Sequence, residues 1–147
     1  MWRRDTSYGM YGACSWGRKI KSITQLNLKE NEKKALQELT EKLSESLPEV
    51  EIILYGSKAR GDSEALSDID VLVLLDREVN NSLEEEIFSI AYEIELEHDV
   101  VFGILVESKV FWNSDLAHAM PIHWNIDREG IMIWRILRKQ SYSSGNK

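Results

Sequence analysis

The sequence is poor in cysteine. Cys14 stands alone among 147 residues, so it can form no disulfide within the chain and no metal centre built from several cysteines. Apolar runs are short as well, and none approaches the roughly 20 residues that a membrane-spanning helix needs. The first residues include Arg3 and Arg4 but lack the apolar stretch of a secretory signal peptide. These absences predict a cytoplasmic protein with no membrane partner.

Positive charge is also scarce. Lysine and arginine number 18 against 25 aspartates and glutamates, which gives a formal net charge of −7. Proteins that neutralise a nucleic-acid backbone need clustered Lys and Arg, so strong nucleic-acid binding is not expected, and a nucleic-acid polymerase is disfavoured. A nucleotide held with magnesium remains compatible with this charge, because the metal supplies positive charge locally.

Hydrophobic residues make up 43% of the chain, which is enough for the core of one domain. Leucines recur at helical spacing up to Pro48, and short β-branched runs alternate with helical patterns after it. Ser82, with Glu85 three residues later, predicts the N-cap of a second helix. The predicted elements are, in order, a helix over 28–47, strands over 50–55 and 69–75, a helix over 82–97, a strand over 99–106, one or two short helices over 111–128, and a strand or helix over 131–136. This order predicts an α/β (α+β) fold, a small mixed β-sheet with helices packed against it.

A single domain over residues 21–138 accounts for all of these elements. Residues 1–20 show no usable periodicity and scattered aromatic side chains, so we expect a poorly ordered N-terminal extension there, with a docking segment as the alternative. Residues 139–147 are polar and are expected to be a flexible tail.

The first chemically informative feature is Gly56-Ser57, directly after a predicted strand and before a polar stretch that could make one helical turn. A glycine at this point lets a ligand approach the backbone closely. The amide groups at the start of the turn, together with the Ser57 hydroxyl, would make an anion site the size of a phosphate.

The second feature is a pair of acids, Asp68 and Asp70, where the next strand opens. Residues two apart on a strand point to the same face, while Ile69 and Val71 take the opposite face. Two neighbouring carboxylates repel each other, and a divalent cation such as Mg²⁺ or Mn²⁺ removes that repulsion. Either feature alone is common as a plain turn or sheet edge. Together they place a phosphate cradle beside a metal site, which a metal-bound triphosphate requires.

These residues form a recognisable signature: Gly56-Ser57-x-x-Arg60-Gly61, followed by Ser67-Asp68-x-Asp70. The signature resembles that of the DNA polymerase beta-like nucleotidyltransferase superfamily, and in particular its small stand-alone minimal nucleotidyltransferase domains. The likeness extends more loosely over residues 28–134 and includes the stretch Asn125–Ile131.

The resemblance implies a Mg²⁺-dependent transfer of a nucleoside monophosphate, first of all AMP from ATP, to an acceptor hydroxyl group. It implies that Asp68 and Asp70 bind the metal and that Gly56 and Ser57 hold the distal phosphates of the nucleoside triphosphate. Arg60 has two open roles: it reaches a phosphate, or it braces the turn through a carboxylate such as that of Asp62 or Glu64.

The family places a third acid on the strand next to that of Asp70, and this sequence departs from the usual pattern there. Asp99 opens the predicted strand 99–106, whose middle contains no acid. We expect Asp99 to be the third catalytic and metal-binding acid, with a helix-to-strand turn residue as the alternative. Glu97 and Asp76 are weaker candidates for that role.

Two functions compete on this evidence. The first is an active nucleotidyltransferase, which by resemblance includes antitoxins that transfer AMP to a small helical toxin encoded nearby. The second is a catalytically inactive domain of the same fold that binds a partner protein or a nucleotide. The position of Asp99 separates them, because an incomplete set of acids would prevent turnover.

Overall fold

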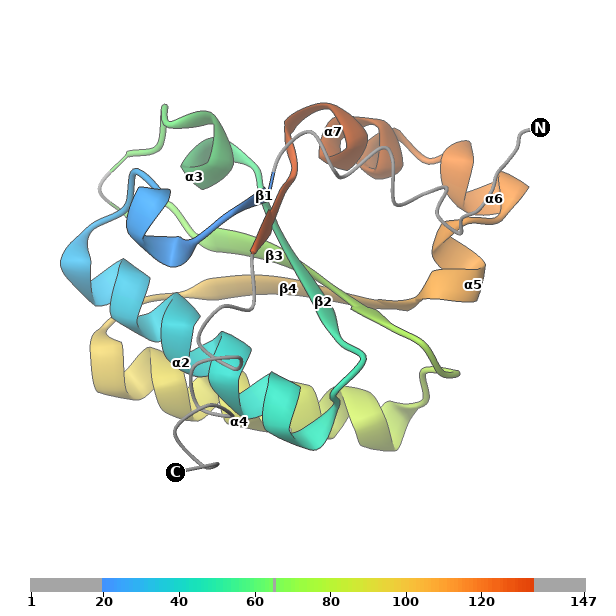
Figure 1. The fold of residues 1–147 in the computed structure, drawn as a ribbon, viewed down its shortest axis with the longest axis horizontal. Coiled ribbons are helices and arrows are strands. Elements are labelled where there is room, and N and C mark those ends of the chain that lie inside the picture. The colour runs from blue at the N-terminus through green and yellow to red at the C-terminus, as the bar shows by residue number, and fades with distance from the viewer. Residues whose placement is uncertain (1–19, 65, 134–147) are drawn as a thin grey trace, which may run out of the picture.

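The computed structural model describes residues 20–64 and 66–133 (Figure 1). The predicted N-terminal extension over residues 1–20 lies outside these residues except for Ile20, which belongs to a strand, and the predicted tail 139–147 lies outside them entirely. Within the described residues, the elements are β1 (Ile20–Lys21), η1 (Ile23–Gln25), α2 (Glu30–Ser46), β2 (Glu51–Tyr55), α3 (Ser57–Arg60), β3 (Ile69–Leu75), α4 (Asn81–His98), β4 (Phe102–Ser108), α5 (Lys109–Trp112), α6 (Asp115–His118), α7 (Pro121–Glu129) and β5 (Ile131–Ile133).

The five strands form one mixed sheet in the order β1-β5-β2-β3-β4. β2 pairs antiparallel with β3 and β5, whereas β4 pairs parallel with β3 and β1 pairs parallel with β5. The parallel pair needs a long crossover, which α4 provides. The predicted mixed sheet with helices packed against it is therefore confirmed.

Alternation along β3 divides the interior into two clusters. Ile69, Val71 and Val73 belong to the larger cluster, which α2 and α4 cover on one face of the sheet. Leu72 and Leu74 belong to a smaller cluster on the other face, with contributions from α5 and α7. Figure 1 shows α2 and α4 side by side below the sheet and α7 above it. By parity, Asp70 faces the same side as Leu72.

The predicted first helix is confirmed as α2. Its leucines recur at helical spacing, and Leu36, Leu39 and Leu43 are completely buried. The helix ends at Ser46, two residues before Pro48, which cannot continue a helix.

The cap predicted for the second long helix is wrong by two residues. Asn80, not Ser82, is the N-cap of α4, and its side chain accepts a hydrogen bond of 2.8 Å from the Leu83 amide. Asparagine caps a helix at least as well as serine, so the helix can begin two residues earlier than predicted. None of the described helices is long and apolar enough to cross a membrane.

The largest boundary error lies after α4. That helix continues to His98, and β4 begins at Phe102 and not at Asp99. The region predicted as one or two short helices over 111–128 contains three, α5, α6 and α7, separated by Ser114 and Met120 as N-caps. The last predicted element is a strand, β5.

Candidate active site

The Gly56-Ser57 motif forms the predicted tight turn. Gly56 has φ of +77° and precedes the single helical turn α3, while Gly61 ends that turn with φ of +85°. The amides of Ala59 and Arg60 both donate to the Gly56 carbonyl at 3.0 Å. Positive φ favours glycine at both ends, since other residues adopt it at a steric cost. The turn therefore follows directly from the sequence of residues 56–61.

The carboxylate of Asp70 lies between two glycines, Gly56 directly after β2 and Gly103 in β4. Asp70 pairs with Tyr55, the residue before Gly56, on one side and with Gly103 of β4 on the other. A β-carbon built on Gly56 would come within 2.5 Å of Asp70 Oδ2, and one built on Gly103 within 2.6 Å of Oδ1. A side chain at either glycine would occupy the space of this carboxylate.

Asp70 lies in an environment that disfavours its negative charge. Burial raises the pKa of Asp70, and the negative charges of Asp68 and Glu129 raise it further, against the opposing effect of Arg60. Asp68 is exposed and Asp70 is partly buried. Burial and nearby negative charges disfavour the ionised form of a carboxyl group, and a bound cation stabilises that form. Carboxylate oxygens are suitable ligands for a hard divalent ion. The residues present therefore fit a magnesium or manganese ion.

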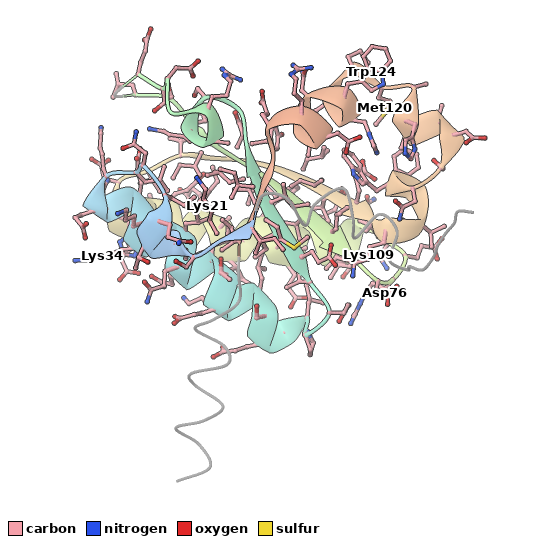
Figure 2. The ribbon with its side chains drawn as sticks, turned by 45° about the horizontal axis from the view of Figure 1, so that its top comes forward. Lys21, Lys34, Asp76, Lys109, Met120 and Trp124 are labelled. Atoms are coloured by element: carbon pink, nitrogen blue, oxygen red, sulfur yellow. The ribbon has the colours of Figure 1, made fainter. Side chains whose placement is uncertain are left out.

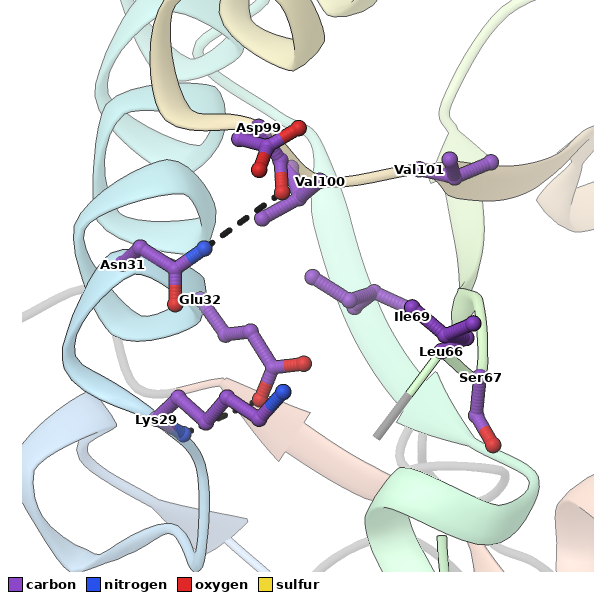
Figure 3. A pocket seen from close by; sticks show the side chains of 9 residues that line it. All are labelled: Lys29, Asn31, Glu32, Leu66, Ser67, Ile69, Asp99, Val100 and Val101. Carbon is purple, nitrogen blue, oxygen red and sulfur yellow. Dashed lines mark hydrogen bonds between the residues drawn. The ribbon is translucent and has the colours of Figure 1, made fainter. Parts of the chain in front are cut away.

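The structure does not bring Asp99 to Asp70. Asp99 is the exposed C-cap of α4, with left-handed φ of 57°, three residues before β4 begins. It lines a pocket with residues of α2 and with Ile69, which faces the side of the sheet opposite to Asp70 (Figure 3). The Asn31 amide group of α2 donates to the backbone carbonyls of His98 and Asp99 in this pocket. Asp99 is thus the helix-to-strand turn residue that was the alternative interpretation. Its position does not support the prediction that it is the third acid of the site.

The weaker candidates for a third acid also lie elsewhere. Asp76 follows the end of β3, at the far end of the sheet from α3 (Figure 2). Glu97 belongs to a group with Glu38 and His98 between α2 and α4, in which ligand atoms lie within 4.8 Å of one another. Within residues 20–64 and 66–133, no such group of three includes Asp68 or Asp70. Within this group, Glu38 Oε1 and His98 Nε2 are already hydrogen-bonded to each other at 2.8 Å.

Arg60 braces the turn, which was one of its two predicted roles. Its Nε lies 3.2 Å from Asp62 Oδ2, and its Nη1 lies 3.1 Å from Glu129 Oε1. Glu129 is the last residue of α7, and its Oε2 also accepts the Gly56 amide at 2.8 Å. Glu64 was the other partner considered for Arg60, and its backbone amide donates a hydrogen bond to the Ser67 hydroxyl. Glu129 was not predicted as a site residue, although it lies within the stretch Asn125–Ile131 that contributed to the family likeness.

A second missed residue lies inside the turn itself. The Lys58 side chain is buried, and its ammonium group lies 2.5 Å from Glu32 Oε2 of α2. The other Glu32 oxygen accepts the Lys29 amide at the start of that helix. Lys58 therefore anchors the turn to α2 and does not extend toward the face that carries Asp70.

Comparisons with known proteins show the family to which the chain belongs. The family described as nucleotidyltransferase domain matches residues 32–124. A protein of Methanocaldococcus jannaschii, provisionally named a protein adenylyltransferase, is 30% identical over 106 residues, which cover 71% of this chain and 99% of the relative. A second protein of that organism with the same provisional name is 33% identical over 63 residues, 43% of this chain and 64% of the relative.

Solved structures with a similar fold are also known. One is a toxin–antitoxin complex with AMP-PNP, with a TM-score of 0.45 at 19% identity over 67% of this chain and 72% of that chain. Another is a variant of the MntA–HpeT toxin–antitoxin complex, with a TM-score of 0.46 at 20% identity over 74% of this chain and 73% of that chain.

Proposed function

The chain belongs to the nucleotidyltransferase domain family, and from that premise we propose that it transfers AMP from ATP to a hydroxyl group of a partner protein. The acceptor oxygen bonds to the α-phosphorus of ATP, the bond from that phosphorus to the β-phosphate breaks, and pyrophosphate leaves. The observation that carries this proposal is the Asp70 carboxylate, which lies directly against Gly56 at the start of the turn. A site for a metal-bound triphosphate needs acids and a phosphate turn in contact, and this chain has both. The protein acceptor and the adenylyl group are suggested by the names of the two archaeal relatives.

In this proposal the turn binds the distal phosphates of ATP. The amides at the start of α3 point out of the first helical turn, and the Ser57 hydroxyl adds a further donor. Arg60 is 47% exposed on its side chain, so its guanidinium can also reach a phosphate while Glu129 holds its other side. Both roles considered for Arg60 are compatible with this position.

Asp68 and Asp70 would hold Mg²⁺, or Mn²⁺ in its place. The bound ion would neutralise the triphosphate and favour ionisation of the acceptor hydroxyl. Asp70 contributes a carboxylate whose place is fixed by the two glycines beside it. Asp68 contributes an exposed carboxylate that can adjust to the ion and to the substrate.

One observation favours the second function, an inactive domain that binds a nucleotide or a partner protein. The β4 residue paired with Asp70 is Gly103, so this strand supplies no carboxylate beside Asp70. Asp99 is the C-cap of α4, lies before β4 begins and lines a pocket with Ile69 and residues of α2, which argues against its replacing that carboxylate. The active and inactive functions therefore differ in whether two aspartates suffice for turnover.

The proposal is tested by incubating the protein with Mg²⁺, each of the four labelled nucleoside triphosphates in turn, and the protein encoded by the adjacent gene. We expect label from ATP on that partner, as would be the case for an antitoxin that modifies its toxin. The variant with Asp68→Asn and Asp70→Asn should lose transfer and remain folded, because amides keep the shape of the carboxylates without their charge. ATP binding without transfer to any protein would favour the inactive domain.

A further inference from the structure

We infer that Glu129 is a positioning residue that holds the Gly56-Ser57 turn in the geometry needed to bind a nucleotide. The inference rests on the proposed function and assigns a role to a residue that the signature of residues 56–70 does not contain. Glu129 lies 73 positions after Gly56 in the sequence, at the end of α7.

The contacts of Glu129 join the two parts of the turn that precede and end α3. Its Oε2 accepts the Gly56 amide at 2.8 Å, before the helical turn begins. Its Oε1 and Oε2 lie 3.1 and 3.2 Å from Arg60 Nη1, at the last residue of the turn. One carboxylate therefore fixes both ends of the segment that would surround the phosphates.

The Glu129 carboxylate is more buried than the carboxylate of an ordinary surface ion pair. The Glu129 side chain is 12% exposed, whereas the glutamate of a comparable pair, Glu49 with Arg77, is 25% exposed. Exposed pairs contribute little to stability, but a hydrogen bond from a backbone amide to a nearly buried carboxylate contributes more. Both Glu129 oxygens already accept hydrogen bonds, so the residue is suited to hold the turn more than to bind a metal.

The position of Glu129 also carries an electrostatic cost. Gly56 contacts Glu129 through its amide and Asp70 through its α-carbon, so little more than one glycine separates the two carboxylates. The negative charge of Glu129 contributes to the raised pKa of Asp70. A neutral acceptor such as glutamine would bond the Gly56 amide without this repulsion. Glutamine at position 129 would keep the geometry of the contact with Gly56 and lose the negative charge. It therefore distinguishes a role of the geometry from a role of the charge.

The experiment compares Glu129→Ala, Glu129→Gln and the matched control Glu49→Ala. Affinity for ATP with Mg²⁺ is measured by calorimetry, and thermal unfolding is measured on the same samples. We expect Glu129→Ala to weaken ATP binding about tenfold, as for the loss of one charge-assisted hydrogen bond. Glu129→Gln should stay within about threefold of the wild type, since it keeps the acceptor, and Glu49→Ala should not change ATP affinity.

A second readout does not depend on ATP. The amide NMR resonance of Gly56 should move in Glu129→Ala and return close to its original position in Glu129→Gln. Equal losses of ATP affinity in both Glu129 variants would overturn the inference in favour of a role for the charge itself. An unchanged ATP affinity in Glu129→Ala would overturn it as well.

If Glu129→Ala does not fold, Glu129→Gln and Arg60→Ala still test whether Glu129 positions the turn. Arg60→Ala removes one of the two contacts, so a turn held by Glu129 should keep its Gly56 resonance in that variant, and a displaced resonance would count against Glu129. If the wild type binds no ATP at all, the proposed function fails, while the Gly56 resonance still reports whether Glu129 positions the turn.

Discussion

Gly103→Ala is the substitution that most directly tests the arrangement around Asp70. Gly103 has no positive φ, so the backbone of β4 accepts an alanine without strain. The new β-carbon would lie 2.6 Å from Asp70 Oδ1, where ordinary contact begins at 3.4 Å. The carboxylate would have to retreat by about 0.8 Å, and on its other side it already lies against Gly56.

The expected cost to folding is small because two effects oppose each other. Moving Asp70 off its preferred rotamer costs roughly 0.5–1.5 kcal/mol. Replacing glycine by alanine within a strand stabilises by roughly 0.5–1 kcal/mol. Urea unfolding should therefore place Gly103→Ala within about 1 kcal/mol of the wild type.

The expected effect on metal binding is larger. Ligand distances in metal sites vary by only about 0.2 Å, so a shift of about 0.8 Å displaces Asp70 from a usable position. We expect Mn²⁺ affinity, measured by electron paramagnetic resonance, to fall about 10–100-fold. The matched control is Gly103→Ala in an Asp70→Ala background, where the alanine meets no carboxylate and should only stabilise the strand. Mn²⁺ affinity at the wild-type level in Gly103→Ala would refute the assignment of Asp70 as a ligand.

Two further predictions concern pH and the buried ion pair. Burial and the charges of Asp68 and Glu129 raise the pKa of Asp70, so the folded protein holds this proton more tightly than the unfolded chain does. The stability of the metal-free protein should therefore fall as pH rises from the ordinary aspartate value of 3.8 through the raised pKa, and Asp70→Asn should remove that part of the pH profile measured by thermal unfolding. Lys58→Met leaves Glu32 buried without its cation and should lower the free energy of unfolding in urea by roughly 3–5 kcal/mol. Adding Glu32→Gln to Lys58→Met should recover most of that loss, and no recovery would mean that packing and not charge holds α3 on α2.

The strand–turn–strand segment of residues 51–75 could be predicted because its signals are local. Gly56 is needed where φ is positive, and alternation along Ile69–Leu75 assigns each side chain of β3 to a face. The helices α2 and α4 follow from apolar periodicity in the same way. These parts of the fold depend little on distant residues.

Asp99 shows where local signals fail. His98-Asp99-Val100-Val101 is compatible with the start of a strand or with a helix C-cap, and the decision depends on where α4 ends. Asn31 of α2 bonds the carbonyls of His98 and Asp99, so a contact across 67 residues of sequence accompanies that end. Aspartate tolerates the left-handed conformation better than most residues, which makes the cap possible. Because β4 begins at Phe102, Gly103 and not an acid lies beside Asp70.

The site around Asp70 is assembled from four segments of the chain. The turn after β2 supplies Gly56, β3 and β4 supply Asp70 and Gly103, and α7 supplies Glu129. Two of these four residues are glycines that act by leaving space, and the two acids repel each other across Gly56. Such an arrangement is stable only when the whole sheet and α7 hold it, because its own charges disfavour it. A peptide of residues 54–76 carries the complete family signature and still lacks Gly103 and Glu129, so we expect it to bind neither Mn²⁺ nor ATP at the affinity of the intact chain.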